Sequence, residues 1–292
     1  MVSTQKSLVV KGTMLIVVGM LFMACGNETP KDESVTSTAK DSVIAEESET
    51  NTVSYSLPSP LQIASIFKKS GLKYQDGITT SLKDPSKYTT NLSKSLNLGV
   101  YSADLSYCVL NKQNQEAMTY MKLCRQLAEN LGMGSVFEQS NLSKRFEKNL
   151  GNEDSLAYII AELQMVTDMY LDENEQPQIT AIVFSGAWIE SMYLGSRIYE
   201  KNKDKSMNTK LTEQMTILGS IVNALKAVQK KDPAIDGLIA DVQSIKNIYD
   251  ELPSVKANPI KEDEDKDITL TDEEVLQLTK RISELRAKFI NG

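Results

Sequence analysis

The chain has 292 residues, of which 41% are hydrophobic and 24% are charged, an ordinary composition for a globular protein with one large domain or two small ones. Its formal net charge of −7 gives no general attraction for phosphate backbones, which argues against a nucleic-acid partner. The chain contains no histidine. This excludes Ser-His-Asp and Cys-His catalysis and every His-ligated metal or haem site, because each needs an imidazole, and we expect no cofactor.

The N-terminal segment has the pattern of a signal peptide. Lys6 and Lys11 precede the uncharged run "GTMLIVVGMLFMA", which ends at Ala24. This run has about the length of a signal-peptide core, and it is shorter than the roughly 20 apolar residues that span a membrane. Cys25 follows directly, between the small residues Ala24 and Gly26.

This arrangement resembles the signal peptide of bacterial lipoproteins, with Phe22 where that family prefers leucine, as in looser Bacteroidota-type versions. The resemblance implies that residues 1–24 are removed and that Cys25 becomes a lipidated N-terminus bearing palmitate-type chains. Two or three such chains hold a protein firmly on a membrane, at about 0.8 kcal/mol per buried CH₂. The alternatives are a plain secretory signal with an unrelated cysteine, or an anchor that is never cut.

Residues 25–56 change sharply in composition. They are rich in Ser, Thr, Asp and Glu, and the stretch from Gly26 to Ser54 has no aromatic residue. Such a segment cannot bury enough apolar surface to fold, which predicts a disordered tether. Its Lys31, Asp32 and Glu33 resemble the signal that sends some Bacteroidota lipoproteins to the cell surface, although an ordinary acidic tether has the same composition. We therefore expect a lipid anchor in the outer membrane, on its periplasmic or its surface-exposed face.

Residues 57–292 are predicted to form an all-α domain, a single compact antiparallel bundle of roughly seven to ten helices. Apolar residues recur at helical spacing, and no two alternating strands flank a hairpin turn. The segment 176–202 is apolar nearly all round, which is typical of a central helix. The predicted helices are 58–72, 101–132 (one helix, or two joined near Asn111), 135–151, 152–174, 176–202, 207–231, 233–252 and 272–290.

Two segments of this domain, "LGVYSADLSY" and "SGAWIESMYL", resemble each other and also resemble uncharacterised Bacteroidota-type all-helical envelope lipoproteins, which brings no activity. A duplicated helical unit would explain this internal sequence similarity. The functional interpretation is an aromatic-lined binding pocket in which carboxylates orient a ligand. The alternative is a pair of buried acids hydrogen-bonded to Tyr hydroxyls or helix ends. The candidate residues are Tyr101, Asp104, Tyr107, Trp188, Glu190 and Tyr193.

Four acids fit the ligand positions of a calcium loop, namely Asp263, Asp265, Asp267 and Glu274. The glycine that this loop needs at its sixth position is replaced by Ile268. The alternative is a solvated charge run, followed by a helix start at which Thr271 is the N-cap and Glu274 completes a capping box. The second interpretation accounts for the same residues, so we expect no metal.

Cysteine and methionine give two further predictions. Cys108 and Cys124 lie in apolar helical stripes, which is typical of free buried cysteines, although export would permit a disulfide between them. The methionine-rich helix faces predict core packing rather than copper binding. They contain Met118, Met121, Met165, Met169 and Met192.

Together these observations predict a lipid-anchored cell-envelope protein with a non-catalytic binding or scaffolding domain. Its ligand would be an envelope protein, a peptide or a small molecule, or the domain would serve only as part of an envelope complex. The enzymatic alternative is a glycan-acting hydrolase that uses Asp104 and Glu190. That mechanism needs both side chains in one open cleft, with the carboxyl groups roughly 5–9 Å apart.

Overall fold

The computed structural model describes residues 57–81, 85–139, 141–227, 232–258 and 268–292. They belong to a unit that spans Val53–Gly292, whereas the other unit, Met1–Thr52, lies outside the described residues, and so do Cys25 and the predicted signal peptide and tether. The elements are α1 (Pro60–Lys69), the 3₁₀ turn η1 (Pro85–Lys87), α2 (Asn91–Leu110), α3 (Asn114–Asn130), α4 (Gly134–Gln139), α5 (Leu142–Lys148), α6 (Glu153–Glu173), α7 (Pro177–Asn202), α8 (Lys205–Met215), α9 (Leu218–Lys226), α10 (Pro233–Glu251), α11 (Pro253–Ala257) and α12 (Asp272–Asn291).

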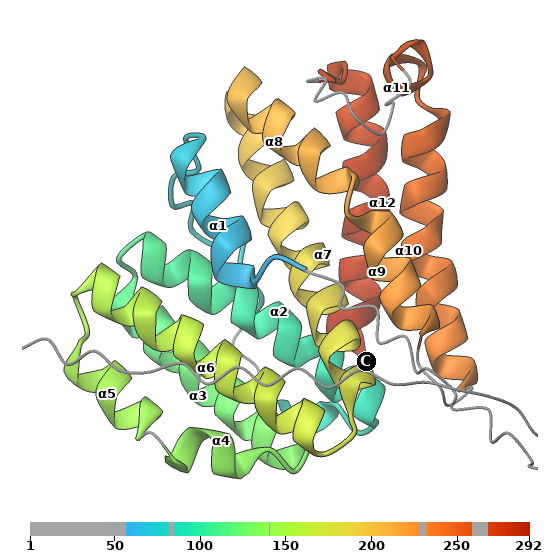
Figure 1. Cartoon of the computed structure of the whole chain (residues 1–292). Helices are drawn as coiled ribbons and strands as arrows, with labels where there is room; N and C mark the ends of the chain where they lie inside the picture. The colour runs from blue at the N-terminus through green and yellow to red at the C-terminus, as the bar shows by residue number, and fades with distance from the viewer. Residues whose placement is uncertain (1–56, 82–84, 140, 228–231, 259–267) are drawn as a thin grey trace, which may run out of the picture. The chain divides into compact units, whose positions relative to one another are not determined.

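The described residues form an all-α fold without strands, as predicted (Figure 1). Twelve α-helices are present in these residues, and three of them, α4, α5 and α11, have seven residues or fewer. The nine longer helices agree with the prediction of roughly seven to ten. None of the helices in the described ranges combines the length and the apolar character that crossing a membrane requires.

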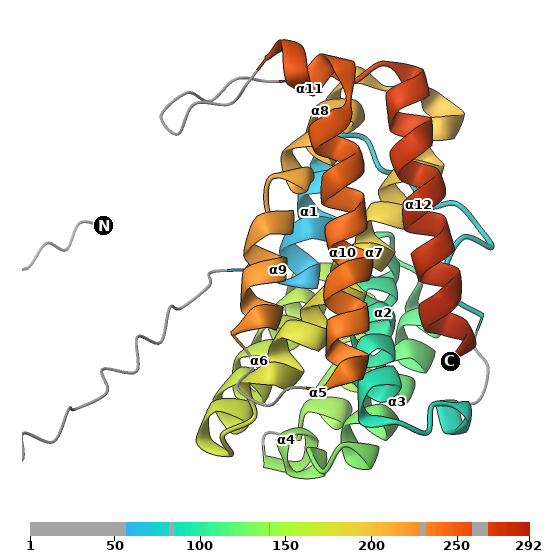
Figure 2. The same ribbon diagram turned by 90° about the vertical axis from the view of Figure 1, so that its right-hand side faces the viewer.

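Helix α7 is the centre of the domain. It packs against α1, α2, α6, α8, α9 and α12, and its buried residues are distributed around the whole helix. Helices α3 and α6 pack on α2 on one side, and α9, α10 and α12 run side by side on the other (Figure 2). The prediction that 176–202 forms a central helix is confirmed.

The crossing of α2 and α7 is a contact between backbones (Figure 1). A Cβ atom on Gly99 would lie 1.9 Å from the carbonyl oxygen of Val183, and one on Gly186 would lie 2.0 Å from that of Leu96. Only glycine permits this approach, because any side chain would overlap the facing helix. The two glycines belong to the two segments that resemble each other, so the structure places these segments face to face.

Capping residues set the starts of several helices. Ser59 with Gln62, and Thr90 with Ser93, form reciprocal capping boxes at the starts of α1 and α2. Thr271 and Glu274 form the box predicted for the last helix. These local hydrogen bonds satisfy backbone N–H groups that have no partner inside the helix.

Some predicted helices are divided in the structure. The segment 101–132 is two helices joined near Asn111, which confirms the second of the two predicted alternatives, and α2 begins ten residues earlier than predicted, at Asn91. Lys112, between α2 and α3, and Asn141, between α4 and α5, have left-handed backbone conformations with φ of 59° and 49°. Helices α8 and α9 divide the segment 207–231 near Thr216, whose hydroxyl donates to the carbonyl of Glu213. Apolar periodicity continues across the breaks at Asn141 and near Thr216, so it does not reveal them.

Candidate functional site

The candidate site residues lie in the interior of the domain. Asp104 on α2 and Glu190 on α7 are both 0% exposed. Four of the six candidates are aromatic, and of these Tyr101, Tyr107 and Trp188 are fully buried whereas Tyr193 is half-buried. The two carboxyl groups are therefore closed off from solvent.

Glu190 is paired with Arg286, which α12 brings into the core. The guanidinium Nε and Nη2 donate to the two carboxylate oxygens at 2.6 and 2.8 Å. The ring centre of Tyr193 lies 4.0 Å from the guanidinium carbon, which is cation–π distance. Burial lowers the pKa of Arg286, but the carboxylate of Glu190 outweighs this and raises that pKa above its ordinary value.

Asp104 has a different environment. Its Oδ2 accepts a hydrogen bond from the backbone N–H of Thr80 at 3.0 Å, whereas its Oδ1 has no hydrogen-bond partner among the described residues. Burial, and then the negative charge of Glu190, raise the pKa of Asp104 well above its ordinary value. This environment favours the uncharged form of the acid.

Thr80 joins these groups into one interior polar cluster, defined as Thr80, Asp104, Glu190, Tyr193 and Arg286. Its hydroxyl accepts a hydrogen bond from Arg286 Nη2 at 3.2 Å, and its carbonyl accepts one from the hydroxyl of Tyr120 at 2.5 Å. The cluster connects α2, α7, α12 and the segment before η1. The alternative to a binding pocket predicted two buried acids hydrogen-bonded to Tyr hydroxyls or helix ends. Both acids are buried, but their partners are Arg286 and Thr80.

Sequence reasoning missed Arg286, although the sequence carries a signal for it. Arg286 lies four residues after Ile282 and three before Phe289, inside the buried stripe of α12. An arginine at a core-facing helix position needs a buried acid, since an unpaired charge there is very costly. Nothing comparable marks Thr80, whose role depends on where its backbone lies.

The remaining candidates pack as core aromatics. Tyr101 lies between Tyr88 and Tyr120, with ring centres 6.3 and 6.0 Å apart. The hydroxyl of Tyr107 accepts a hydrogen bond from the backbone N–H of Gln75 at 2.7 Å. Trp188 is fully buried, and no atom in the described part of the chain accepts a hydrogen bond from its indole N–H. These rings fill the space around α2 and α7.

The acids of the calcium-loop hypothesis are only partly described. Asp263, Asp265 and Asp267 lie outside the described residues. The carboxylate of Glu274 accepts hydrogen bonds from the backbone and the hydroxyl of Ser254 at 2.8 and 2.6 Å, besides capping α12. Within the described ranges, no three His, Cys, Asp or Glu side chains are grouped so that they could hold a metal ion.

The cysteine prediction is confirmed, because Cys108 and Cys124 are free and buried, and the disulfide alternative is wrong. Burial raises the pKa of Cys124 to about 12, so this thiol is inert. Met121 and Met192 are core residues as predicted. The prediction is wrong for Met165 and Met169, which are 55% and 54% exposed.

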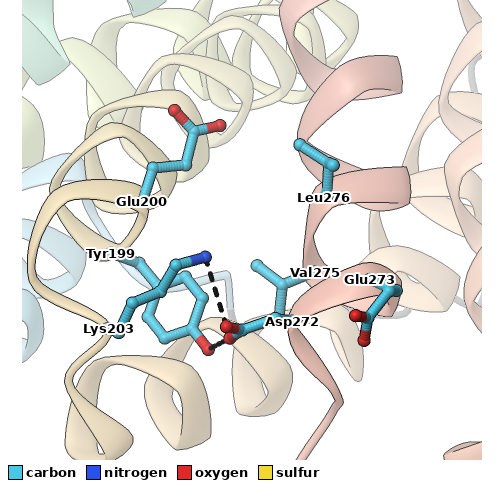
Figure 3. Close-up of a pocket in the computed structure, with 7 residues that line it drawn as sticks. All are labelled: Tyr199, Glu200, Lys203, Asp272, Glu273, Val275 and Leu276. Atoms are coloured by element: carbon cyan, nitrogen blue, oxygen red, sulfur yellow. Dashed lines mark hydrogen bonds and ion pairs between the residues drawn. The ribbon is translucent and has the colours of Figure 1, made fainter.

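A surface pocket of about 140 Å³ lies between the C-terminal end of α7 and the N-terminal end of α12 (Figure 3). The Tyr199 hydroxyl donates to Asp272 Oδ1 at 2.5 Å, and Lys203 Nζ lies 3.5 Å from Asp272 Oδ2. The hydrogen bond from Tyr199 holds the pKa of Asp272 below its ordinary value. The pocket is smaller than most ligand sites, and these three polar groups are already engaged with one another, so it is a weak candidate for ligand binding.

The pH dependence of stability tests the protonation of Asp104. Its raised folded-state pKa means that the folded chain binds this proton more tightly than the unfolded chain. The Asp104 contribution is therefore largest at low pH and falls as pH rises from about 4 through the folded-state pKa. Asp104→Asn, which stays neutral, is expected to lose less thermal stability than the parent between pH 4 and pH 8 in circular dichroism melts.

Asp236→Asn, at an exposed position on α10, is the matched control for the exchange of a carboxyl group for an amide. A profile for Asp104→Asn that is as steep as that of the parent would show that Asp104 is ionised in the folded state.

Comparisons of the chain with models of known protein families, with curated proteins and with solved structures gave no match. The function is therefore inferred from the residues themselves.

Proposed function

We propose that this chain is a lipid-anchored cell-envelope protein whose helical domain acts as a non-catalytic binding or scaffolding module. One observation supports the non-catalytic part. The two acids most suited to catalysis are 0% exposed, and Arg286 and Thr80 already engage them. The domain therefore offers its surface to a partner, such as an envelope protein or a peptide.

The anchoring part rests on the sequence around Cys25. Two lysines, an uncharged run and a cysteine between Ala24 and Gly26 resemble the signal peptide of bacterial lipoproteins, with Phe22 in place of the preferred leucine. Two or three acyl chains on Cys25 would attach the chain stably to the outer membrane. The membrane is then the first partner of the protein, and the ligand of the helical domain is the second.

The hydrolase alternative has no support from this geometry. A glycosidic bond must reach both carboxyl groups at once, and a water molecule must enter beside them. Glu190 is locked in a bidentate pair, and Asp104 faces the core. Neither carboxyl group is available to a polymeric substrate in this conformation.

Substitution of Cys25 tests the anchor. The parent chain should fractionate with outer membranes, require detergent for release, and have an intact mass above that of residues 25–292 by the mass of its acyl chains. Cys25→Ala should move to the soluble fraction and carry no lipid, with a signal segment that is uncut or cut elsewhere. Cell fractionation and intact-mass spectrometry measure both properties.

Cys124→Ala is the matched control, because it removes a buried thiol and leaves Cys25 in place. It should remain on the membrane with the lipidated mass. Unchanged fractionation and mass for Cys25→Ala would disprove the anchor.

A further inference from the structure

Helix α6 presents apolar side chains on its outer side. Tyr158, Met165 and Met169 are 67%, 55% and 54% exposed. In the part of the chain that the structure describes, they are three of the four large hydrophobic residues with such exposure, and the fourth is Leu276 on α12. The opposite side of α6 is buried in the core through Leu156, Ile159, Ile160 and Leu171.

These three side chains form one stripe, which we call the α6 outer face. Their spacings of seven and four residues place them on the same side of a helix. The exposed Ala161 lies on the same side of the helix, between Tyr158 and Met165 in the chain. The stripe covers eleven residue steps, which is about 16 Å at 1.5 Å per residue. This length matches three turns of a second helix laid alongside.

The charge on α6 has one sign. The helix carries six acidic residues and no lysine or arginine. Asp154 precedes Tyr158 by one turn and Asp172 follows Met169 by three residues, so exposed carboxylates lie at both ends of the α6 outer face. Glu162 beside the stripe is held by Arg145 of α5 through two hydrogen bonds of 2.7 Å, and Gln164 donates to Asp168.

We propose that the α6 outer face docks an amphipathic helix of a partner protein, one that carries apolar residues along one side and lysine or arginine near both ends of that side. This proposal rests on the proposed function and names the surface and the partner class. Methionine suits such a surface, because its flexible side chain adapts to the apolar residues of a partner. Helices that dock in this way use anchors one and two turns apart, which is the spacing of this stripe.

The charges select this partner over two others. A second copy of the chain would bring the acids of one α6 against those of the other in either orientation, and like charges repel. An anionic lipid surface would be repelled in the same way. A cationic helix gains from both ends of the stripe, where Asp154 and Asp172 meet its basic residues.

The test uses a fluorescent helical peptide of about 18 residues, five turns, built from leucine, alanine and lysine, with leucines one and two turns apart and lysines at the flanks. The full chain, lipidated and loaded into nanodiscs of zwitterionic lipid, is titrated against it by fluorescence anisotropy, with empty nanodiscs as the blank. Met165→Glu should weaken binding about tenfold, although it adds negative charge, because it interrupts the apolar stripe. Asp172→Asn should weaken it by about threefold, and a peptide with glutamate in place of lysine should bind far less.

Leu276→Glu is the matched control, since it places the same charge on an equally exposed apolar position of α12. It should leave the affinity for the lysine peptide unchanged. If Met165→Glu alters the helical content, Met165→Gln replaces it as an uncharged variant. Equal affinities for the parent and the Met165 variant, or equal losses for the Met165 and Leu276 variants, would overturn the proposal.

Vesicle flotation of the full-length Cys25→Ala chain addresses the membrane as the occupant. Flotation with zwitterionic or anionic vesicles that is lost in the Met165→Glu variant would overturn the partner-helix proposal in favour of a lipid surface. Failure of the anchor is seen separately, because a chain without lipid would not co-elute with nanodiscs before any peptide is added. The peptide titration is then carried out on the free chain.

Discussion

Replacing Gly99 by alanine is expected to lower the free energy of unfolding by about 3 kcal/mol or more. The added Cβ would lie 1.9 Å from the Val183 carbonyl oxygen and 2.7 Å from the Ala187 backbone nitrogen. Both are backbone atoms of the central helix, so neither can rotate away as a flexible side chain would. The two helices must separate, and the buried contacts on each side of the crossing must loosen with them. Urea denaturation followed by far-UV circular dichroism measures the loss.

The glycine of the opposite helix gives the reciprocal test. Gly186→Ala should destabilise to a similar extent, because its Cβ would lie 2.0 Å from the Leu96 carbonyl oxygen. Gly237→Ala on α10 is the control, since a Cβ added there would meet no neighbouring atom within 4 Å. It should raise the free energy of unfolding by about 0.5–1 kcal/mol, the usual gain from alanine in an exposed helix. A loss below about 1 kcal/mol for both crossing glycines would show that α2 and α7 move apart easily.

Arg286→Met is expected to cost about 3–5 kcal/mol of folding free energy. The substitution keeps much of the side-chain volume but removes both hydrogen bonds to Glu190, and it leaves that carboxyl group fully buried without its cation. It also removes the hydrogen bond that Arg286 Nη2 donates to the hydroxyl of Thr80. The expected readout is a lower urea midpoint at pH 7.

The matched control is Arg281→Met on the same helix. Arg281 lies closer to the surface and pairs with Asp241 at 3.3 Å, so its loss should cost about 1 kcal/mol or less. A double variant, Arg286→Met with Glu190→Leu, should recover much of the stability, because an apolar pair replaces the buried ion pair. A double variant as unstable as Arg286→Met alone would show that the guanidinium acts through contacts other than Glu190.

Predictions from the sequence agree with the structure where the deciding interactions join residues close together in the chain, and they fail where those interactions join distant residues. Helices begin where local signals stand, as at Thr271 and Glu274, because the capping hydrogen bonds join residues three apart. Helix α7 was recognised as central because burial on all sides requires apolar residues on all sides. The division of 135–151 at Asn141 was missed, because a single left-handed residue leaves the periodic pattern unchanged.

The candidate site shows the other limit. The sequence indicated Asp104 and Glu190 as unusual acids in apolar helices, but the partner of Glu190 is 96 residues away in the chain. The methionines of α6 are a second example, because they were predicted to be buried and are exposed. Met169 follows Val166 at the three-residue spacing of an apolar stripe, but over thirteen residues that stripe turns to the side opposite Leu156, and Met169 is more than half exposed. Which side of such a helix is covered depends on the neighbouring helices.

The helical class, the exclusion of imidazole chemistry and the prediction of a lipid anchor at Cys25 all follow from the amino-acid sequence, because each depends on composition or on residues close together in the chain. Three other properties could be read only from the folded chain: Asp104 and Glu190 lie in a closed core, Gly99 and Gly186 are at a backbone contact between two helices, and Met165 and Met169 face outward. These properties arise from the packing of helices that are distant in sequence. The burial, ion pairing and exposure of a side chain depend on which helices surround it.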